Sequence, residues 1–358
     1  MNPIVSIIIL NWNGWRDTIE CLESLFRISY PSYEVILLDN ASKDDSLQNI
    51  KDYLAGRRTD ICSDFFEYSP ANKPISILEY TNEEAEAGGG REEEIEDLPS
   101  NERLVLIKND KNYGFAEGNN IGTRYAMKAY DPEYILLLNN DTTVDRDFLS
   151  ELVSAADADE KIGFAGPKIY YYDYQGRKDV ISVAGIDLYL RRGSFRRIGA
   201  QEEDRGQYDE LRTVDYLEGS CLLIKRRVLK EIGLLDSDYF AYWEETDLCL
   251  RGAKAGYRSI YVPKSKIWHK VSSSSIGLNK LYYMTRNRLW FIRDNAPAGD
   301  LAHFLMYFFA YQFWLDSGAY VRRRDFARLK TFLAAVRDGM IRRRRGKPYL
   351  SKSSDAQV

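Results

Sequence analysis

Short apolar runs that alternate with helical patterns are the feature that most constrains how this chain can fold. Residues 4–10, 33–38, 104–108 and 134–138 are nearly continuous runs rich in Ile, Leu and Val. Such runs are typical of strands that are buried on both faces of a parallel sheet. A helical pattern follows each of them. Strands and helices in alternation predict an α/β fold, with a Rossmann-like, mostly parallel central sheet flanked by helices.

Each of these runs ends in polar residues, and ligands of open α/β sheets bind beyond the carboxyl ends of the strands. Asn11 and Asn13 follow the first run, and Asp39 and Asn40 follow the second. The third run leads into the Gly- and Asn-rich segment 112–120 and then into a helix. Glycines at such a turn allow the backbone to approach a phosphate, and a helix N-terminus attracts anions.

The fourth run ends in Asn139, Asn140 and Asp141. An acid at the end of a buried strand can hold a divalent cation through its oxygens, but it can equally cap the helix that begins near Asp147. His269 is one of only two histidines, and we expect it in a loop after a strand at 257–262. An isolated histidine is usually a packing or surface residue, so that its role as a metal ligand stays open alongside that of Asp141.

A third polar group follows aromatic residues. Tyr242 and Trp243 directly precede Glu244, Glu245 and Asp247, where another helical pattern begins. Acids are common in a first helical turn, where the helix dipole favours negative charge. The aromatic side chains can also desolvate a carboxylate and raise its pKa towards that of a working general base. Both interpretations, a helix start and a catalytic base, are compatible with these residues.

Composition limits the functional classes. The 358 residues are 44% hydrophobic and have a net charge of −4, which allows a sizeable core and argues against general nucleic-acid binding. The four cysteines form no CxxC pair, so we expect neither a zinc site nor a disulfide framework. The N-terminal residues show no signal-peptide pattern. These features predict a cytoplasmic protein.

Two further segments stand apart from the strand–helix pattern. Residues 55–103 contain two Glu-rich clusters around three consecutive glycines, which predicts a solvated or mobile insertion. Residues 301–315 are apolar nearly all round but fall short of the roughly 20 residues of a membrane span. Arginines follow at 322–324 and 342–345. This C-terminal part is compatible both with helices packed on the domain and with peripheral docking on an anionic membrane.

Together, these patterns resemble family 2 glycosyltransferases, which have the GT-A fold, and most closely their rhamnosyltransferase-like branch. The resemblance covers about residues 4–295 apart from the insertion. It rests on segments that occur in the family's order: SIIILNWNG at 6–14, VILLDNAS at 35–42, NYGFAEGNN at 112–120, LLLNNDT at 136–142 and YFAYWEETDLCLR at 239–251. It implies a GT-A domain at 1–295 and a helical, basic extension at 296–358.

The resemblance also implies roles for individual residues. Asp39 would bind the base of a nucleotide sugar, with Asn11 and Asn13 nearby. Other members of the nucleotide-sugar pocket would be Asn40, Asn112, Gly114, Phe115, Gly118, Asn119, Asn139 and Asn140. Asp141 and His269 would bind Mg²⁺ or Mn²⁺, and Glu245 would be the general base, with Glu244 and Asp247 in the same acidic group.

The implied reaction is inverting transfer of a sugar from a nucleoside-diphosphate sugar to a hydroxyl of a glycan or lipid-linked acceptor, with dTDP-rhamnose or a UDP-sugar as donor. Two positions depart from the family pattern: Asn139 replaces the first acid of the DxD motif, and Glu245 replaces an Asp. The alternatives are therefore a non-catalytic nucleotide-sugar-binding protein and a nucleotidyltransferase. The latter would carry a basic, Gly-rich loop after the first strand, and residues 11–15 hold one glycine and no basic residue.

Overall fold

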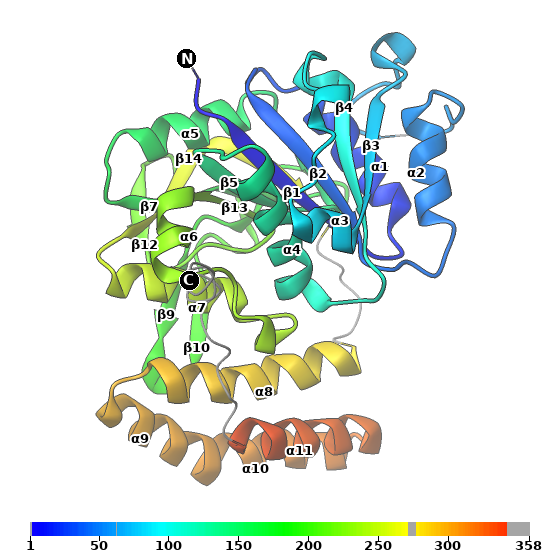
Figure 1. Cartoon of the computed structure of the whole chain (residues 1–358). Coiled ribbons are helices and arrows are strands. Elements are labelled where there is room, and N and C mark those ends of the chain that lie inside the picture. Colours follow the sequence, from blue (N-terminus) through cyan, green and yellow to red (C-terminus); the bar gives the residue numbers. More distant parts are fainter. Residues whose placement is uncertain (1, 62, 271–276, 342–358) are drawn as a thin grey trace, which may run out of the picture.

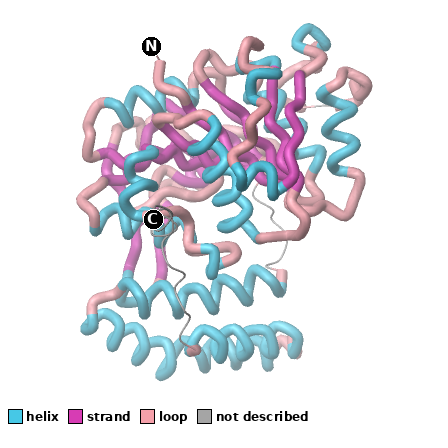
Figure 2. Tube along the Cα trace, viewed as in Figure 1, coloured by secondary structure: helices cyan, strands magenta, loops and turns pink. Residues whose placement is uncertain are grey.

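The structure is a computed structural model that describes residues 2–61, 63–270 and 277–341. Its upper part is a twisted sheet between layers of helices, and its lower part is a separate helical layer (Figure 1). Strands from both halves of the sequence belong to one sheet, and Figure 2 shows the strands gathered between helices. Within the described residues, no helix combines the length and the apolar character that a membrane span requires.

The parallel half of the sheet contains the four predicted strands and one that was not predicted. Its order is β5–β1–β2–β4–β3, and every pair in it is parallel. The strands are β1 (Val5–Asn11), β2 (Tyr33–Asp39), β3 (Ser76–Thr81), β4 (Arg103–Lys108) and β5 (Tyr134–Asn139). Asn11 pairs with Asp39, and Leu10 pairs with Asn139. The polar ends of β1, β2 and β5 therefore meet at one edge of the sheet.

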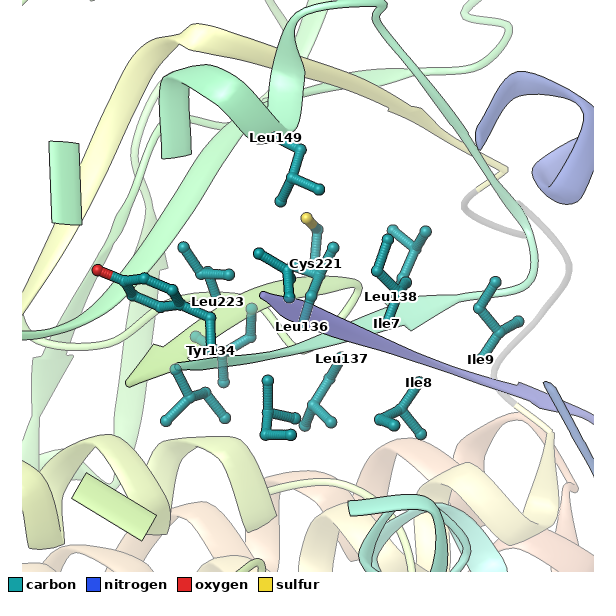
Figure 3. Packing of buried hydrophobic residues seen from close by; sticks show 14 of the residues in the cluster. Ile7, Ile8, Ile9, Tyr134, Leu136, Leu137, Leu138, Leu149, Cys221 and Leu223 are labelled. Atoms are coloured by element: carbon teal, nitrogen blue, oxygen red, sulfur yellow. The ribbon is translucent and has the colours of Figure 1, made fainter. Parts of the chain in front are cut away.

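Strand β1 is buried on both faces, as its continuous apolar run predicts. Ile7 and Ile9 point to one side of the sheet and Ile8 to the other (Figure 3). The layers that cover the sheet include α1 (Trp15–Leu25), α2 (Ser46–Leu54), α4 (Gly114–Ala129) and α5 (Phe148–Asp157). Gly122 allows α4 to pack closely on the strands, because a Cβ at this position would stand 2.7 Å from Ile8 and from Leu38.

The second half of the sheet continues from β5 and is mixed: β13 pairs antiparallel with β5 and β7, whereas β14 pairs parallel with β7. It contains β6 (Thr142–Val144), β7 (Ile162–Tyr171), β8 (Val180–Val183), β11 (Glu202–Glu203), β12 (Arg212–Val214), β13 (Cys221–Lys225) and β14 (Arg258–His269). Strand β14 is longer than the predicted 257–262. His269 therefore ends a strand instead of lying in a loop, and it pairs with Thr142 of β6. This pairing brings the end of β14 beside Asp141.

The acidic insertion is more ordered than the sequence suggested. Residues 76–81 form the edge strand β3, and α3 (Asn82–Ala87) begins with a capping box between Thr81 and Glu84. Glu86 forms an ion pair with Arg124 of α4, and the Glu92 carboxylate accepts hydrogen bonds from the hydroxyls of Tyr80 and Tyr125. Acids that composition predicted to be solvated thus fasten the insertion to the domain, whereas residues 93–94 and 96–97 are exposed as expected.

The helical layer follows α6 (Arg226–Ile232) and α7 (Glu244–Lys254). It consists of α8 (Leu278–Asn295), α9 (Ala298–Tyr307), a π-helical turn at Phe308–Gln312, α10 (Phe313–Arg322) and α11 (Phe326–Met340). The hairpin of β9 (Ile186–Tyr189) and β10 (Ser194–Arg197) reaches down to this layer (Figure 1). A second apolar core, which includes Trp243, Phe291 and Phe304, joins the layer to the start of α7.

Close packing of α4 on the sheet leads to a matched pair of stability predictions. Gly122→Ala places a methyl group against Ile8 and Leu38 in a filled core, and overpacking of this kind costs about 1–3 kcal/mol. Gly318→Ala in α10 meets no atom within 4 Å, and the better helix propensity of Ala stabilises that helix by up to about 1 kcal/mol. Urea unfolding measures both variants. The packing account is contradicted if Gly122→Ala unfolds at the wild-type urea concentration.

Candidate active site

The segment before α7 has an unusual backbone. Phe240, Tyr242 and Trp243 have φ angles of 66°, 70° and 80°, a region that bulky side chains avoid. Such strain persists only where surrounding contacts over-determine the conformation, and it gathers at functional sites. Here the strained segment leads directly into Glu244 and Glu245, and it determines where these carboxylates lie.

Asn287 of α8 is the main contact that holds this segment. Its side chain is fully buried, and its Nδ2 donates to the carbonyl oxygens of Tyr239, Ala241 and Tyr242 at 2.9, 2.8 and 2.8 Å. The neighbouring Arg286 donates to the carbonyl oxygens of residues 238 and 239. The helical layer therefore fixes the backbone that precedes the two catalytic candidates.

The same segment is bound from the other side by α4. The backbone N–H groups of Phe115 and Ala116 donate to the carbonyl oxygen of Phe240 at 2.6 and 3.1 Å. Gly114, with a φ of 77°, lies so close that a Cβ there would be 2.5 Å from the Phe240 ring. Gly114 and Phe115, both predicted to shape the nucleotide-sugar pocket, thus connect that region to the loop that carries the acids.

Glu244 and Glu245 differ in their surroundings. Glu244 is buried, and burial together with the adjacent Glu245 charge raises its pKa well above its usual range. Glu245 is half-buried, and burial raises its pKa to about 7. Each has an Oε2 atom without a hydrogen-bond partner among the described residues. Burial therefore favours the neutral form of Glu244, whereas a pKa of about 7 allows Glu245 to exchange a proton near neutral pH, which is the property that a general base needs.

Two residues that the sequence did not single out stand next to Glu245. The Arg197 guanidinium donates to Glu218 at 2.9 Å, and the charges of both residues act on Glu245 and on His269. A Cβ on Gly219 would lie 3.6–3.8 Å from the Glu245 side chain. Arg197 lies in the β9–β10 hairpin and Glu218 lies in a loop. No pattern in the sequence connects these two residues to the acids of α7.

Asp247, predicted in the same catalytic group, has structural contacts. Its carboxylate accepts from Arg251 at 2.7 Å and from the side chain of Asn295 at 3.0 Å, and it is almost completely buried. These bonds tie α7 to α8. Residue 247 occupies a different face of α7 from residue 245, and its catalytic role stays a prediction.

The predicted metal ligands lie together. His269 Nε2 is 3.1 Å from Asp141 Oδ1. Burial disfavours the charged imidazole, but the Asp141 carboxylate more than offsets this effect and raises the pKa of His269. His269 Nδ1 and Asn139 Oδ1 are buried without partners among the described residues. A pair of ligands with unused polar atoms suits Mg²⁺ or Mn²⁺, which commonly complete their shell with water and substrate phosphates.

In the described parts of the chain there is no group of three or more His, Cys, Asp or Glu residues that could hold a metal ion. Among the described residues, the candidate ligands at this place are therefore Asp141 and His269, with Asn139 as a neutral neighbour. Oxygens from a substrate phosphate or from water are the usual further ligands of Mg²⁺.

At the ends of β1 and β2, the polar side chains bind one another. Asn11 donates to Asp39 at 2.8 Å, and Ser42 donates to both oxygens of that carboxylate, from its hydroxyl at 2.6 Å and its backbone N–H at 3.0 Å. Asn13, with a φ of 53°, accepts from the backbone of Lys43 at 2.7 Å. Asn11 and Ser42 therefore orient Asp39 at the edge where the resemblance places the nucleotide base.

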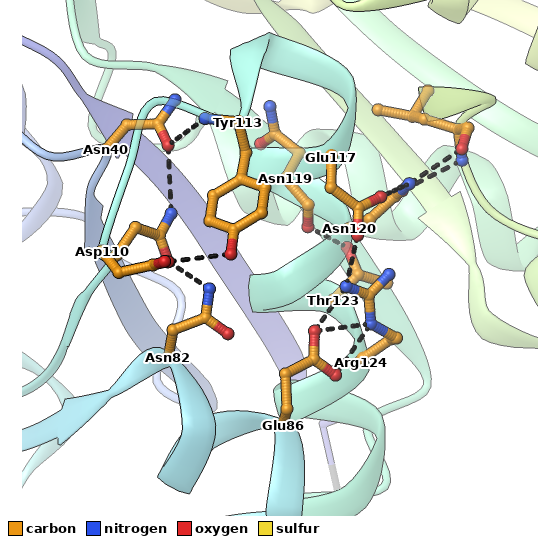
Figure 4. A network of polar contacts seen from close by, with 12 residues as sticks. Asn40, Asn82, Glu86, Asp110, Tyr113, Glu117, Asn119, Asn120, Thr123 and Arg124 are labelled. Carbon is orange, nitrogen blue, oxygen red and sulfur yellow. Dashed lines mark hydrogen bonds and ion pairs between the residues drawn. The ribbon is translucent and has the colours of Figure 1, made fainter. Parts of the chain in front are cut away.

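Asn40 organises the loop between β4 and α4. Its Oδ1 accepts from Asn109 and from the backbone of Tyr113, each at 3.1 Å (Figure 4). Its Nδ2 donates to Asn112 at 3.0 Å and to the carbonyl oxygen of Gly114 at 3.2 Å. Both the oxygen and the nitrogen of the Asn40 amide are bonded to other protein groups. Asn40 therefore shapes the predicted pocket by holding the loop in place.

The remaining predicted pocket residues also have identifiable contacts. A Cβ on Gly118 would stand 2.8 Å from Leu10, so this glycine allows close packing of α4 on β1. Asn119 donates to the carbonyl oxygen of Phe115 at 2.8 Å, and Asn140 donates to Thr18 at 2.9 Å. Asn120, labelled in Figure 4, pairs with the backbone of Leu235 and ties α4 to the segment before the acids.

Comparison with known proteins identifies the class to which this fold and site belong. A family model described as "Glycosyltransferase like family 2" matches residues 91–289, more than half of the chain, and one described as "Glycosyl transferase family 2" matches residues 6–64. The chain therefore belongs to glycosyltransferase family 2. This confirms the family and the GT-A fold predicted from the sequence.

Three curated relatives are similar over part of their length. The hexosyltransferase Agl10 of low-salt glycan biosynthesis from Haloferax volcanii is 27% identical over 45% of this chain and 50% of its own length. The N-acetylglucosaminyl-diphospho-decaprenol L-rhamnosyltransferase of Mycobacterium tuberculosis is 28% identical over 57% of this chain and 69% of its own. The rhamnosyltransferase WbbL of Escherichia coli is 29% identical over 42% of this chain and 58% of its own. These relatives place the chain in the rhamnosyltransferase-like branch.

Two solved structures share the fold at low sequence identity. The mannosyltransferase PcManGT from Pyrobaculum calidifontis, in complex with GDP-Man and Mn²⁺, has a TM-score of 0.51 at 15% identity, with 100% of this chain and 77% of that chain covered. S. aureus TarS in complex with UDP-GlcNAc has a TM-score of 0.51 at 14% identity, with 95% and 80% covered. At these identities the likeness concerns the fold alone.

The position of Asn287 predicts a specific kinetic defect. Asn287→Leu removes three hydrogen bonds from the strained loop, so Glu245 loses its fixed position, and a misplacement of about 1 Å can cost on the order of 100-fold in rate. We expect kcat to fall with little change in the donor KM, and the pH dependence to shift. Asn295→Leu on the same helix is the matched control, since it lowers stability without touching the loop. Equal kcat values for the two variants would contradict a positioning role for Asn287.

The raised pKa of Glu245 predicts the pH profile. A general base works when it is ionised, so kcat/KM should rise with pH and level off above an apparent pKa near 7. Glu245→Gln should lose about 10²- to 10⁴-fold in rate together with this inflection. Glu244→Gln should stay active, because burial favours the neutral form of Glu244 and the proton transfer is assigned to Glu245. The opposite pattern in the two glutamine variants would assign the base to Glu244.

Proposed function

We propose that this protein is an inverting glycosyltransferase that moves a hexose from a nucleoside-diphosphate sugar to a hydroxyl group of a glycan or lipid-linked acceptor. The observation that carries the proposal is Glu245, a half-buried carboxylate with a pKa of about 7 and an oxygen without a partner among the described residues. It lies in the first turn of α7, directly after the loop that is bound to the N-terminus of α4. Family membership and the names of the relatives support rhamnose as the sugar, with dTDP-rhamnose or a UDP-sugar as donor.

The reaction is a single displacement. Glu245 accepts the proton of the acceptor hydroxyl while the oxygen of that hydroxyl forms a bond to the anomeric carbon. The bond from that carbon to the nucleoside diphosphate breaks, and the diphosphate leaves with the electron pair. Attack from the face opposite the leaving group inverts the anomeric carbon.

Asp141 and His269 are the residues that would hold Mg²⁺ or Mn²⁺. When bound, the cation supplies positive charge that offsets the negative charge of the leaving diphosphate. Asp39, oriented by Asn11 and Ser42, would bind the nucleotide base, and the N-terminus of α4 would face the anionic part of the donor.

We further propose that residues 1–295 form the transferase domain and residues 296–358 an appendage on the cytoplasmic face of a membrane. Of the residues at 301–321, all of which the structure describes, the exposed ones carry no formal charge when His303 is neutral. The large apolar ones, Met306, Phe309, Tyr311, Trp314, Leu315 and Val321, form what we call the outer apolar face. Arg322, Arg323 and Arg324 follow and are all exposed.

An anionic bilayer matches this combination, because apolar insertion and a basic patch together give stable peripheral attachment. The helices that carry the outer apolar face lie in the layer farthest from the sheet (Figure 1). The second cluster of arginines, predicted to contribute at 342–345, lies outside the described residues.

The metal site predicts a loss of activity on chelation. EDTA should abolish sugar transfer, and added Mn²⁺ should restore it in the wild type. Asp141→Asn should need a much higher Mn²⁺ concentration, because it removes the charged protein ligand. Asp110→Asn, an exposed acid at the same edge, is the control. Full sugar transfer in EDTA would contradict the metal assignment but would leave the transferase assignment unchanged.

Membrane attachment predicts the outcome of a flotation assay. The full chain should float with vesicles that contain phosphatidylglycerol, and the double variant Trp314→Ser, Leu315→Ser should float less, because it removes inserted apolar surface. Leu211→Ser, which changes an apolar residue that is 56% exposed elsewhere on the domain, is the control. If the wild type remains at the bottom of the gradient at low salt, the membrane assignment is wrong.

A further inference from the structure

A second pocket, separate from the predicted nucleotide edge, lies between the β9–β10 hairpin and the helical layer. Its volume is about 480 Å³, and we call it the helical pocket. Trp243, the residue immediately before Glu244, forms part of its wall. The pocket therefore begins one residue away from the acidic pair of the candidate active site.

Most of the wall is aromatic or apolar. Phe195 lies edge-on to Trp243, with ring centres 6.0 Å apart, and also edge-on to Tyr216, at 6.1 Å. Phe308 and Phe332 line the pocket from the helical layer, and Met284 lines it from α8. An apolar chain can pack against such walls. The Phe195 ring separates this space from Tyr216, whose pKa responds to the charge of Glu245.

One basic residue stands in this apolar surrounding. Arg288 lines the pocket and is mostly buried; it donates to Gln312 at 2.9 Å and to the carbonyl oxygen of Arg192. Its Nε is buried without a partner, and no carboxylate lies within ion-pair distance of it among the described residues. Burial lowers its pKa to about 10, so the guanidinium is charged at neutral pH.

Asp316 is the acid of this pocket, and Gln312 lies between it and Arg288. Burial raises the pKa of Asp316, and the Arg288 charge partly opposes this effect. Its carboxylate accepts a long 3.4 Å contact from Gln312. Asp316 therefore offsets part of the Arg288 charge, but the buried Arg288 Nε still lacks a hydrogen-bond partner among the described residues, and an unsatisfied buried donor is costly. A ligand with a negatively charged group would remove that cost, provided that the rest of the ligand is apolar enough for the aromatic walls.

The helices that form the inner wall of the pocket also carry the outer apolar face. Tyr307, Phe308 and Gln312 line the pocket, whereas Met306, Phe309 and Tyr311 are exposed on the other side of the same turns. The chain here contains a π-helical turn, a distortion that is frequent at functional sites. The same turns therefore carry both pocket-lining residues and residues of the surface that we assign to the membrane.

We propose that the helical pocket binds the phosphate-bearing lipid part of the acceptor, with Arg288 contacting the phosphate and the aromatic walls contacting the first apolar units of the chain. This inference rests on the proposed function and specifies its acceptor as a lipid phosphate or diphosphate. The pocket orients the acceptor, because Trp243 links it to the loop that carries Glu245.

Farnesyl diphosphate is the probe that tests the pocket without sugar transfer. Binding to the full chain is measured by the quenching of tryptophan fluorescence, in EDTA and saturating dTDP so that the nucleotide edge cannot take up the probe. We expect saturable binding, with farnesol and inorganic diphosphate each at least about tenfold weaker, since each lacks one of the two recognised parts. Arg288→Met should weaken binding about tenfold or more, because it removes a charge-assisted contact. Arg205→Met, which changes an exposed arginine outside the pocket and outside the proposed membrane surface, should leave binding unchanged.

The controls separate this proposal from the proposed function. Met284→Trp fills the pocket while Arg288 remains, so it should also abolish binding, and it decides the question if Arg288→Met does not fold. Hydrolysis of donor nucleotide sugar by water is measured on the same variants and should persist. If farnesyl diphosphate does not bind, or binds equally to wild type and Met284→Trp, the proposal is overturned, while donor hydrolysis independently tests the transferase assignment.

Discussion

The hydrogen bonds from Asn287 to the loop at 239–243 are the interaction on which the rest of the site depends. A single buried amide donates to three carbonyl oxygens and holds three bulky residues in the left-handed region. The loop gains a second support where α4 donates to Phe240. The acids of α7 thus lie between the nucleotide-binding half of the molecule and the helical layer. This arrangement explains why the C-terminal helices matter to a site whose chemistry resides in the sheet domain.

The two adjacent carboxylates, Glu244 and Glu245, differ in their pKa values. Burial, with the Glu245 charge beside it, raises the pKa of Glu244 well above its usual range, and burial raises the pKa of Glu245 to about 7. The Arg197–Glu218 pair lies close enough to act on Glu245 and on the Asp141–His269 pair at the same time. Proton removal and support of the leaving group are therefore adjacent functions in one buried, polar region. The replacement of Asp by Glu at 245 is compatible with this geometry, because Gly219 leaves space beside the longer side chain.

The sequence predicted the parallel strands and their polar ends well, because runs such as 4–10 and 134–138 are apolar on both faces and end abruptly in Asn and Asp. The resemblance to the family also predicted that Asp141 and His269 lie together, and they are 3.1 Å apart. Prediction from the sequence failed where long-range pairing decides the outcome. Strand β14 extends to His269 because β6 and β7 pair with its second half. The acids at 86 and 92 became structural because their partners, Arg124 and Tyr125, are distant in sequence. Asn287 carried no signal beyond being a polar residue in a helix, and its importance depends on a loop more than 40 positions earlier in the chain.

The central claim is that one carboxylate assists a single displacement at the anomeric carbon. The anomeric configuration of the product tests this claim most directly. The donor that supports turnover would be incubated with an acceptor, and the one-bond C–H coupling at the new anomeric carbon would be read by NMR. The account predicts a product of opposite anomeric configuration to the donor. A product with the configuration of the donor would require either two displacements through a covalent intermediate or front-side attack, and it would contradict the role of Glu245 as a general base for direct attack.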